Sequence, residues 1–163
     1  MRKPLVTVTP KSLLRLPAAR STGEELATGS FLEVLPDRDG PKPEDVRRVL
    51  LCSGKIAHEL RKRRADTKAG DIAIVRLEQL YPFPAEDLKA ELERYGDAEV
   101  VWVQEEPDNM GAWRYVRLAA ERTLDLRLRG LTRDEGAAPA TGSPTIHEQE
   151  QTALLTEAFA STG

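Results

Sequence analysis

The stretch VLLCSGK, Val49 to Lys55, decides the fold that we predict for this chain. Its first four residues form the continuous apolar run that is typical of a strand buried on both faces. Ser53 and Gly54 then stand at the entry of a helical segment that we expect to reach about Lys68. Apolar residues four apart give that segment one buried side. The stretch therefore predicts a strand, a tight turn and a helix.

Two further apolar runs of the same kind follow, Ile72 to Leu77 and Val100 to Val103. Between them, Pro84 to Tyr95 has leucines at helical spacing, and Gly96 ends it. From Trp113 the apolar residues again have helical spacing. Strands that alternate with helices predict an α/β fold with a mostly parallel sheet, because parallel neighbours need a crossover connection. We expect three layers, with helices on both faces of the sheet.

The edges of this sheet are predicted from weaker patterns. Leu5 to Val8 is a β-branched run that indicates a strand, and Pro36 to Asp45 is rich in the residues of an exposed connector. Leu124 to Leu128 alternates leucine with charge, so we expect a strand with one wet face at a sheet edge, where an antiparallel strand is allowed. Thr145 and Glu148 have capping-box spacing ahead of a last helix.

Length and charge exclude several classes of function. A chain of 163 residues suits one domain, residues 1–163, with one hydrophobic core. A net charge of −3 gives no basic surface for a phosphate backbone, and 5% aromatic residues give few platforms for bases. No apolar run approaches the roughly 18 residues of a membrane span. We expect neither nucleic acid nor a membrane as a partner.

The single cysteine and the two histidines also limit the possible functions. Cys52 stands alone, which excludes an internal disulfide and a cysteine metal cluster and fits a reducing compartment, so we expect a cytoplasmic protein. His58 and His147 are the only histidines, and we interpret both as polar surface or boundary residues. The sequence therefore predicts no metal site.

Two adjacent carboxylates lie in the stretch WVQEEPDNMGAW, Trp102 to Trp113. Glu105 and Glu106 follow a buried strand, at the edge where open α/β sheets place their sites. Adjacent side chains of an extended segment point to opposite faces, so the two seldom share a proton, and we assign no catalytic residue. Arg76, a charge within an apolar strand, needs a partner. We expect it to pair with Glu105 or Glu106, with a ligand phosphate as the alternative.

The rest of that stretch is predicted to be a structural loop that shapes an interface. Asn109 and Gly111 tolerate positive φ and let the chain turn into the next helix. Trp113, like Trp102, buries a large area and is expected to anchor the core or an interface. Neither tryptophan implies a cofactor.

Two motifs suit an anion. In TPKSLLR, a predicted strand end delivers Lys11, Ser12 and Arg15. In SGK, residues 53–55, a glycine and a lysine stand at a helix N-terminus, where free N–H groups attract phosphate. If the two strands point the same way, the motifs meet at one edge of the sheet. We therefore name these six residues as a candidate effector site.

The second motif also has a purely structural interpretation. Ser53 can be a plain N-cap, Gly54 can serve tight packing of helix on strand, and Lys55 can be a solvated charge. Caps are common, so each residue taken singly fits the structural interpretation better. The convergence of two motifs is what favours the effector site.

Four stretches carry a resemblance to a known family. MRKPLVTVTPKSLLR, LLCSGKI, DIAIVRLEQLYPFP and WVQEEPDNMGAW occur in this order, and together they resemble the C-terminal domain of the 2-oxoglutarate dehydrogenase decarboxylating component. The tail, APATGSPTIHEQEQ and the last helix, resembles the family's ending more loosely, so the likeness covers nearly the whole chain. The resemblance implies a transketolase-type C-terminal fold that follows two thiamine-diphosphate-binding domains.

The resemblance also implies where the chemistry lies. The family's thiamine diphosphate, magnesium and catalytic residues belong to domains absent from this chain, so the isolated chain is expected to be inactive. The full enzyme is a homodimer of the citric acid cycle, and it passes a succinyl group to the lipoyl-bearing succinyltransferase component. An effector pocket for AMP or acetyl-CoA lies in or beside this domain in bacterial members.

Two other functions stay open. A stand-alone nucleotide- or CoA-binding regulatory module would use the same anion motifs. A small hydrolase is disfavoured, since no nucleophile, base or metal cluster is evident.

Overall fold

The computed structural model describes residues 3–4 and 6–160. The chain forms two compact units, Met1–Phe31 and Leu32–Gly163. The first unit holds two 3-10 turns, Leu13–Arg15 and Pro17–Ala19, and the short helix α1, Gly23–Thr28. The helix begins with a capping box, in which the Thr22 side chain accepts from Glu25 N–H and the Glu25 carboxylate accepts from Thr22 N–H.

The strand predicted at Leu5 to Val8 is wrong as far as the structure describes it. Leu5 lies outside the described residues, and Val6, Thr7 and Val8 form no strand. Val6 and Val8 are 83% and 96% exposed. A β-branched run indicates a strand only when another strand accepts its hydrogen bonds, and no strand of the described chain pairs with this one.

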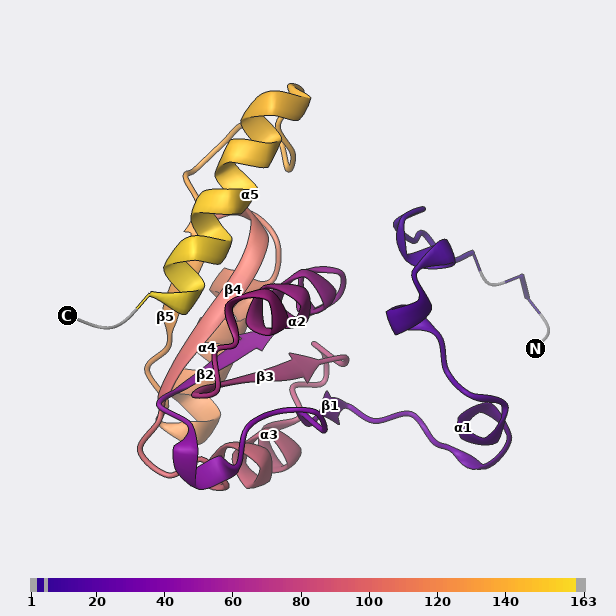
Figure 1. The fold of residues 1–163 in the computed structure, drawn as a ribbon, viewed down its shortest axis with the longest axis vertical. Coiled ribbons are helices and arrows are strands. Elements are labelled where there is room, and N and C mark those ends of the chain that lie inside the picture. Colours follow the sequence, from indigo (N-terminus) through magenta and orange to yellow (C-terminus); the bar gives the residue numbers. More distant parts are fainter. Residues whose placement is uncertain (1–2, 5, 161–163) are drawn as a thin grey trace. The chain divides into compact units, whose positions relative to one another are not determined.

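The second unit is an α/β fold around one five-stranded sheet (Figure 1). The strand order is β1-β3-β2-β4-β5, with β1 antiparallel to β3 and the other three pairs parallel. The strands are β1 Val34–Leu35, β2 Arg48–Cys52, β3 Ile72–Leu77, β4 Glu99–Pro107 and β5 Arg129–Arg133. The helices are α2 Ile56–Thr67, α3 Ala85–Glu93, α4 Trp113–Leu124 and α5 Pro144–Phe159, and Pro43–Asp45 is a 3-10 turn.

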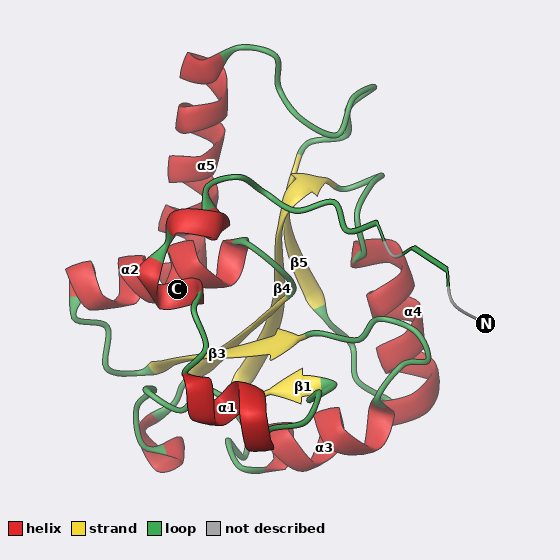
Figure 2. Ribbon diagram, turned by 90° about the vertical axis from the view of Figure 1, so that its right-hand side faces the viewer, coloured by secondary structure: helices red, strands yellow, loops and turns green. Residues whose placement is uncertain are grey.

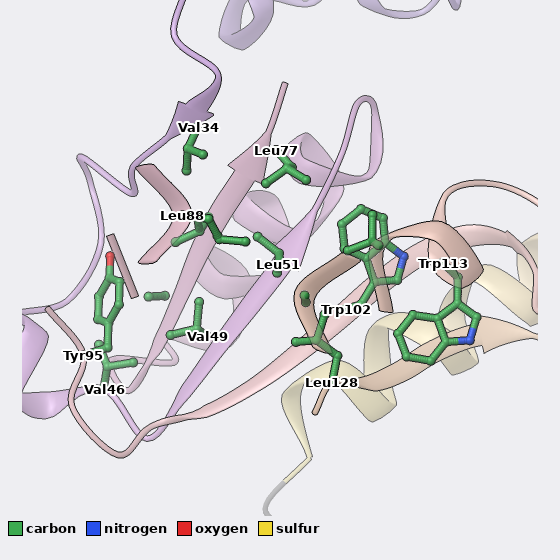
Figure 3. Close-up of a cluster of buried hydrophobic side chains, with 14 residues drawn as sticks. Val34, Val46, Val49, Leu51, Leu77, Leu88, Tyr95, Trp102, Trp113 and Leu128 are labelled. Carbon is green, nitrogen blue, oxygen red and sulfur yellow. The ribbon is translucent and has the colours of Figure 1, made fainter. Parts of the chain in front are cut away.

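Helices cover both faces of the sheet, which confirms the predicted three layers (Figure 1, Figure 2). Every residue of β2 is buried, because it lies between two parallel neighbours and under helices on both sides. Its alternate residues enter two separate cores. Leu50 packs in a cluster with residues of α2 and α5, and Leu51 packs with residues of α3 and α4. Figure 3 draws the second of these clusters, which contains both tryptophans.

The sheet edges differ from the predictions. Leu124 ends helix α4, and Asp125 then takes a left-handed φ of 51°, so the predicted strand Leu124 to Leu128 is wrong. The edge strand β5 begins at Arg129, one residue after the end of the predicted strand, and runs parallel to β4. The antiparallel edge strand is β1, which has two residues and therefore no detectable period.

The connector predicted to be exposed contains a buried acid. Asp37 is 7% exposed. It accepts a hydrogen bond of 2.7 Å from the Ile74 backbone N–H, and it pairs with Arg64 of α2. Because an N–H on this edge of β3 has no further strand to bond, the carboxylate replaces the missing partner. The connector thus continues the hydrogen bonding of β1 along β3.

Helix α5 is fixed at both ends. Its N-cap is Ser143, whose side chain accepts from the Ile146 N–H, so the predicted cap at Thr145 is wrong by two residues. At the other end, Arg48 of β2 donates to the carbonyls of Ala158 at 3.0 Å and Ala160 at 2.8 Å. Helix ends leave such carbonyls without partners, and a buried guanidinium satisfies two of them. Arg48 is 2% exposed.

None of the described helices has the length and apolar composition needed to cross a membrane.

Candidate functional site at the carboxyl edge of the sheet

Lys55 lies between two carboxylates at the carboxyl edge of the sheet. Its Nζ is 2.6 Å from Glu105 Oε2 at the end of β4 and 3.0 Å from Glu59 Oε1, one turn along α2. Burial lowers the pKa of Lys55, but the two carboxylates outweigh it and raise the pKa above its ordinary value. The lysine of the SGK motif therefore forms partly buried ion pairs with these two carboxylates. Its interpretation as a solvated charge is wrong.

The network continues from Glu59 across two more elements. Glu59 Oε2 accepts from Gln151 of α5 at 2.7 Å. Gln151 in turn accepts from Arg133 of β5 at 2.8 Å, and Arg133 pairs with Glu150 at 3.1 Å. One chain of polar contacts thus joins the ends of β4 and β5 to α2 and α5. An anion arriving at Lys55 would compete with carboxylates that already hold it.

Ser53 and Gly54 form the turn into α2. Gly54 has φ of +71°, and a Cβ there would meet nothing within 4 Å. The turn needs this glycine for its backbone conformation, so the interpretation as tight packing is wrong. The N-cap position of α2 is Lys55, with no side-chain capping bond, and Ser53 is therefore not the cap.

The other motif lies in the first unit. Lys11, Ser12 and Arg15 are exposed around the 3-10 turn Leu13–Arg15. Ser12 makes no side-chain capping bond to this turn. The two motifs belong to different units, and their meeting stays a prediction.

Arg76 pairs with Glu78 and not with either predicted glutamate. Arg76 Nε is 2.7 Å from Glu78 Oε1. The two residues are separated by one position, so their side chains leave the extended segment on the same face. Glu105 is held instead by Lys55. The expectation that Arg76 has a carboxylate partner is confirmed, but its assignment to Glu105 or Glu106 is wrong.

Gln104 organises the loop WVQEEPDNMGAW. Its Oε1 accepts from Trp102 Nε1 at 3.0 Å and from the Trp113 backbone N–H at 2.9 Å. Its Nε2 donates to the carbonyls of Pro107 at 3.1 Å and Met110 at 2.8 Å. Gln104 is 3% exposed, so these bonds form away from water. One amide therefore fixes both ends of the turn from β4 into α4.

The predicted loop residues support the same turn. Gly111 has φ of +67°, and a Cβ there would meet the Gln104 side chain at 2.9 Å. Asn109 accepts from the Gly136 N–H and donates to its carbonyl at 2.9 Å, which ties this turn to the loop after β5. Trp113 is 6% exposed, and its Nε1 donates to Asp108 at 2.8 Å. Trp113 thus anchors the core at this turn, and its role at an interface stays a prediction.

Sequence reasoning missed the role of Gln104. The available signal was an amide two residues after Trp102 and thus on the same face of the strand. A polar residue in that position at the end of a buried strand needs several partners, which a following turn can supply.

The described residues offer little chemistry of their own. Among them, no group of three or more His, Cys, Asp or Glu side chains could hold a metal ion. Burial raises the pKa of the Cys52 thiol to about 12, which leaves it without thiolate character at neutral pH. Glu105 faces a lysine and not its neighbour. The arrangement suits binding and support of a loop.

Comparison with known families identifies the chain's relatives. Residues 20–159 match the family model described as 2-oxoglutarate dehydrogenase C-terminal. The chain is 47% identical over 98% of its length to the 2-oxoglutarate dehydrogenase E1 component of Azotobacter vinelandii. It is 42% identical over 98% of its length to that of Haemophilus influenzae, and 42% identical over 97% to the 2-oxoadipate dehydrogenase complex component E1 of Mus musculus.

The chain is much shorter than these relatives. It spans 18%, 17% and 18% of the length of the Azotobacter, Haemophilus and mouse proteins.

Proposed function

The chain belongs to the family of 2-oxoglutarate dehydrogenase C-terminal domains, and from this we propose that residues 1–163 act as the C-terminal domain of a thiamine-diphosphate-dependent 2-oxoglutarate dehydrogenase of the citric acid cycle. The observation that carries the proposal is the 47% identity over 98% of the chain to a 2-oxoglutarate dehydrogenase E1 component. In this role the domain supports oxidative decarboxylation without performing it. The assembly is a cytoplasmic homodimer that works with a lipoyl-bearing succinyltransferase component.

Thiamine diphosphate and magnesium do not fit the residues present. Magnesium prefers clustered carboxylates, and the described chain has no cluster of that kind. We assign both groups to regions of the dehydrogenase that have no counterpart here, and no step of the reaction is derived from this chain.

An exposed aromatic surface supports a contact role in the dimer. Phe83 and Tyr115 meet edge to face with ring centroids 6.4 Å apart. Tyr81, two residues before Phe83, is 81% exposed, and Leu118, three residues after Tyr115 on α4, is 43% exposed. These four residues, the aromatic patch, include three of the eight aromatic residues of the chain. Interface cores are enriched in such residues, so we propose that the aromatic patch, together with the loop fixed by Gln104, contacts the rest of the dehydrogenase dimer.

An effector-binding role, argued for each of the two anion motifs by itself, is a further part of the proposal. Lys11, Ser12 and Arg15 supply exposed basic and hydroxyl groups, and residues 53–55 supply a helix start. AMP or acetyl-CoA would bind through phosphate. Lys55 must exchange Glu105 for the ligand, so we expect weak binding by the isolated chain.

Complementation tests the domain role. The chain is combined with an Azotobacter E1 component truncated before the region it matches, and decarboxylation of 2-oxoglutarate is measured. We expect no activity from the chain alone and restored activity from the mixture. A Tyr81→Ser, Leu118→Ser variant should restore less, whereas Lys62→Gln, a change at an exposed i,i+4 pair, should restore as much as the parent. Decarboxylation by the chain alone would overturn the proposal.

Calorimetric titration tests the effector pocket and its rival. Heat with AMP or acetyl-CoA that is weakened by Lys11→Ala, Lys55→Ala supports the pocket, and no heat at millimolar ligand contradicts it. A stand-alone regulatory module is the second candidate, favoured only by the same anion motifs. It predicts tight binding by the chain alone together with failure to complement.

A further inference from the structure

One side of helix α2 carries an excess of positive charge beside β3. His58 and Arg61 are three residues apart on α2 and therefore share one side of the helix. Arg76 lies at the carboxyl end of β3, against which α2 packs, and it stands opposite Cys52 in the sheet register. Arg76 and Arg61 both act electrostatically on His58 and on Cys52. Arg76 shares its face of β3 with Ile72 and Ile74, which pack in one cluster with residues of α2, so the three side chains lie on the α2 side of the sheet near the buried Cys52.

Three polar atoms of this group are shielded from water and make no hydrogen bond. Nδ1 of His58 and the Nε atoms of Arg61 and Arg76 are buried and have no hydrogen-bond partner in the described chain. The exposed Glu78 forms an ion pair with Arg76 at 2.7 Å without hydrogen-bond geometry. No described residue forms an ion pair or hydrogen bond with Arg61. Two guanidinium groups and a histidine therefore share one carboxylate.

Three other cations in or next to the same helix pair with carboxylates. Lys62 pairs with Asp66, and Arg64 pairs with Asp37. Lys55 has two carboxylates, as described above. A half-buried arginine without a partner costs free energy, since arginine is rarely buried unpaired. Among the described residues, Arg63, which has only a 3.4 Å bond to the Thr156 hydroxyl, also lacks a carboxylate, but no second arginine of the sheet accompanies it as Arg76 accompanies Arg61.

A small multivalent anion would complete this group. Guanidinium groups bind phosphate-type oxygens in short, strong and often bidentate hydrogen bonds. A histidine beside the anion can add a further donor from either ring nitrogen. We propose that His58, Arg61 and Arg76 form a binding site for a phosphate-class anion on the β3 side of α2. The site shares no residue with the TPKS and SGK motifs, and it does not rest on the proposed function.

The pKa of His58 gives a direct measurement of anion binding. In the absence of the anion, burial and the charges of Arg76 and Arg61 hold the pKa of His58 below its ordinary value, opposed only by Glu78. A bound anion favours the protonated imidazole and must raise that pKa. Proton NMR of the imidazole C2–H signal follows the pKa of His58, and the loss of one of the two histidine signals in His58→Gln identifies it.

Sulfate is the probe, because it stays a dianion across the titration. Sodium sulfate is compared with sodium chloride at equal ionic strength, which separates binding from screening. We expect sulfate to raise the pKa of His58 more than chloride does. Equal effects of the two salts on His58 would overturn the proposal.

Two variants locate the site. Arg61→Gln removes a charged hydrogen bond and should weaken sulfate binding about tenfold or more. Lys62→Gln, the adjacent exposed cation, should leave sulfate binding unchanged. Equal affinity of the parent and the Arg61 variant overturns the proposal. If the Arg61 variant does not fold, Arg76→Lys keeps the charge, loses the planar fork, and should still weaken binding.

Competition then distinguishes a free anion from the phosphate of a larger ligand. A site for inorganic anions prefers phosphate to AMP, whereas a nucleotide site prefers AMP to both phosphate and adenosine. Displacement of sulfate by either phosphate compound supports the anion site, and displacement by neither overturns it.

Discussion

Replacement of Gln104 by methionine removes the amide that fixes the turn from β4 into α4. Methionine has nearly the same length and volume, so the change creates little cavity. It leaves Trp102 Nε1 and the Trp113 N–H without an acceptor, and both of these hydrogen bonds are buried. The Pro107 carbonyl still accepts from the Met110 N–H at 2.9 Å, and the part-buried Met110 carbonyl can turn to water. The two donors therefore dominate the cost.

The expected loss of stability follows from the two buried donors that lose their acceptor. A buried donor without a partner costs about 1–3 kcal/mol, so the two donors together cost about 2–6 kcal/mol. A domain of ordinary stability has only about 5–15 kcal/mol in total. At an m-value of about 2 kcal/mol per molar, a loss of about 4 kcal/mol lowers the urea midpoint by about 2 M. The variant should fold but unfold at much lower urea.

Urea unfolding followed by far-UV circular dichroism measures this loss. Gln79→Met is the matched control, because Gln79 makes a single exposed bond to the Pro82 carbonyl, and it should cost about 1 kcal/mol or less. Trp102→Phe removes one of the stranded donors. The double variant with Gln104→Met should therefore recover about 1–3 kcal/mol relative to the sum of the single changes. A Gln104 variant no less stable than the Gln79 control, or strictly additive changes, would refute the assigned role.

Three other properties can be measured on the same chain. Cys52, whose pKa is raised to about 12, should not react with a thiol reagent at pH 8 until urea unfolds the protein, and rapid labelling without denaturant would contradict its burial. Gly130→Ala should cost about 1–3 kcal/mol, because its Cβ would lie 2.5 Å from the ring of Trp113, and wild-type stability would mean that the ring moves freely. The pKa of His58 is lowered on folding, so the unfolded chain binds more protons and stability should fall as the pH drops below about 6.5, the unfolded value. His58→Gln should lose less stability than the parent between pH 7.5 and 5.5 by urea midpoint, and equal losses would exclude that shift.

The parallel strands and their helices could be predicted from the sequence because each carries its own hydrophobic pattern. Val49 to Cys52 is apolar throughout and is buried throughout. The edge strands carry no such pattern. Val34 and Leu35 form a strand of two residues, and their pairing with β3 depends on the tertiary structure. Leu124 to Leu128 has the period of a strand but packs as a helix end and a turn.

The candidate site was harder to predict, because its contacts join residues far apart in the chain. Lys55 and Glu105 come together only when β2 and β4 pair in parallel and end at the same edge. The position of Arg76 within an apolar strand predicted that it needs a partner but did not indicate which acid. Glu78, two residues later, is that partner. The many hydrogen bonds of Gln104 likewise depend on the course of the loop and not on a local motif.

The bond between Arg48 and the end of α5 has a consequence for synthesis on the ribosome. Arg48 lies in the central strand of the sheet, yet its carbonyl partners come 110 and 112 residues later. In a nascent chain that has already assembled β2, β3 and β4, Glu99 can accept from Arg48 Nε, but the two carbonyl acceptors of its Nη1 have not been translated. The sheet can therefore reach its final free energy only after the last helix has left the exit tunnel, and until then the vacant helix position is open to chaperones.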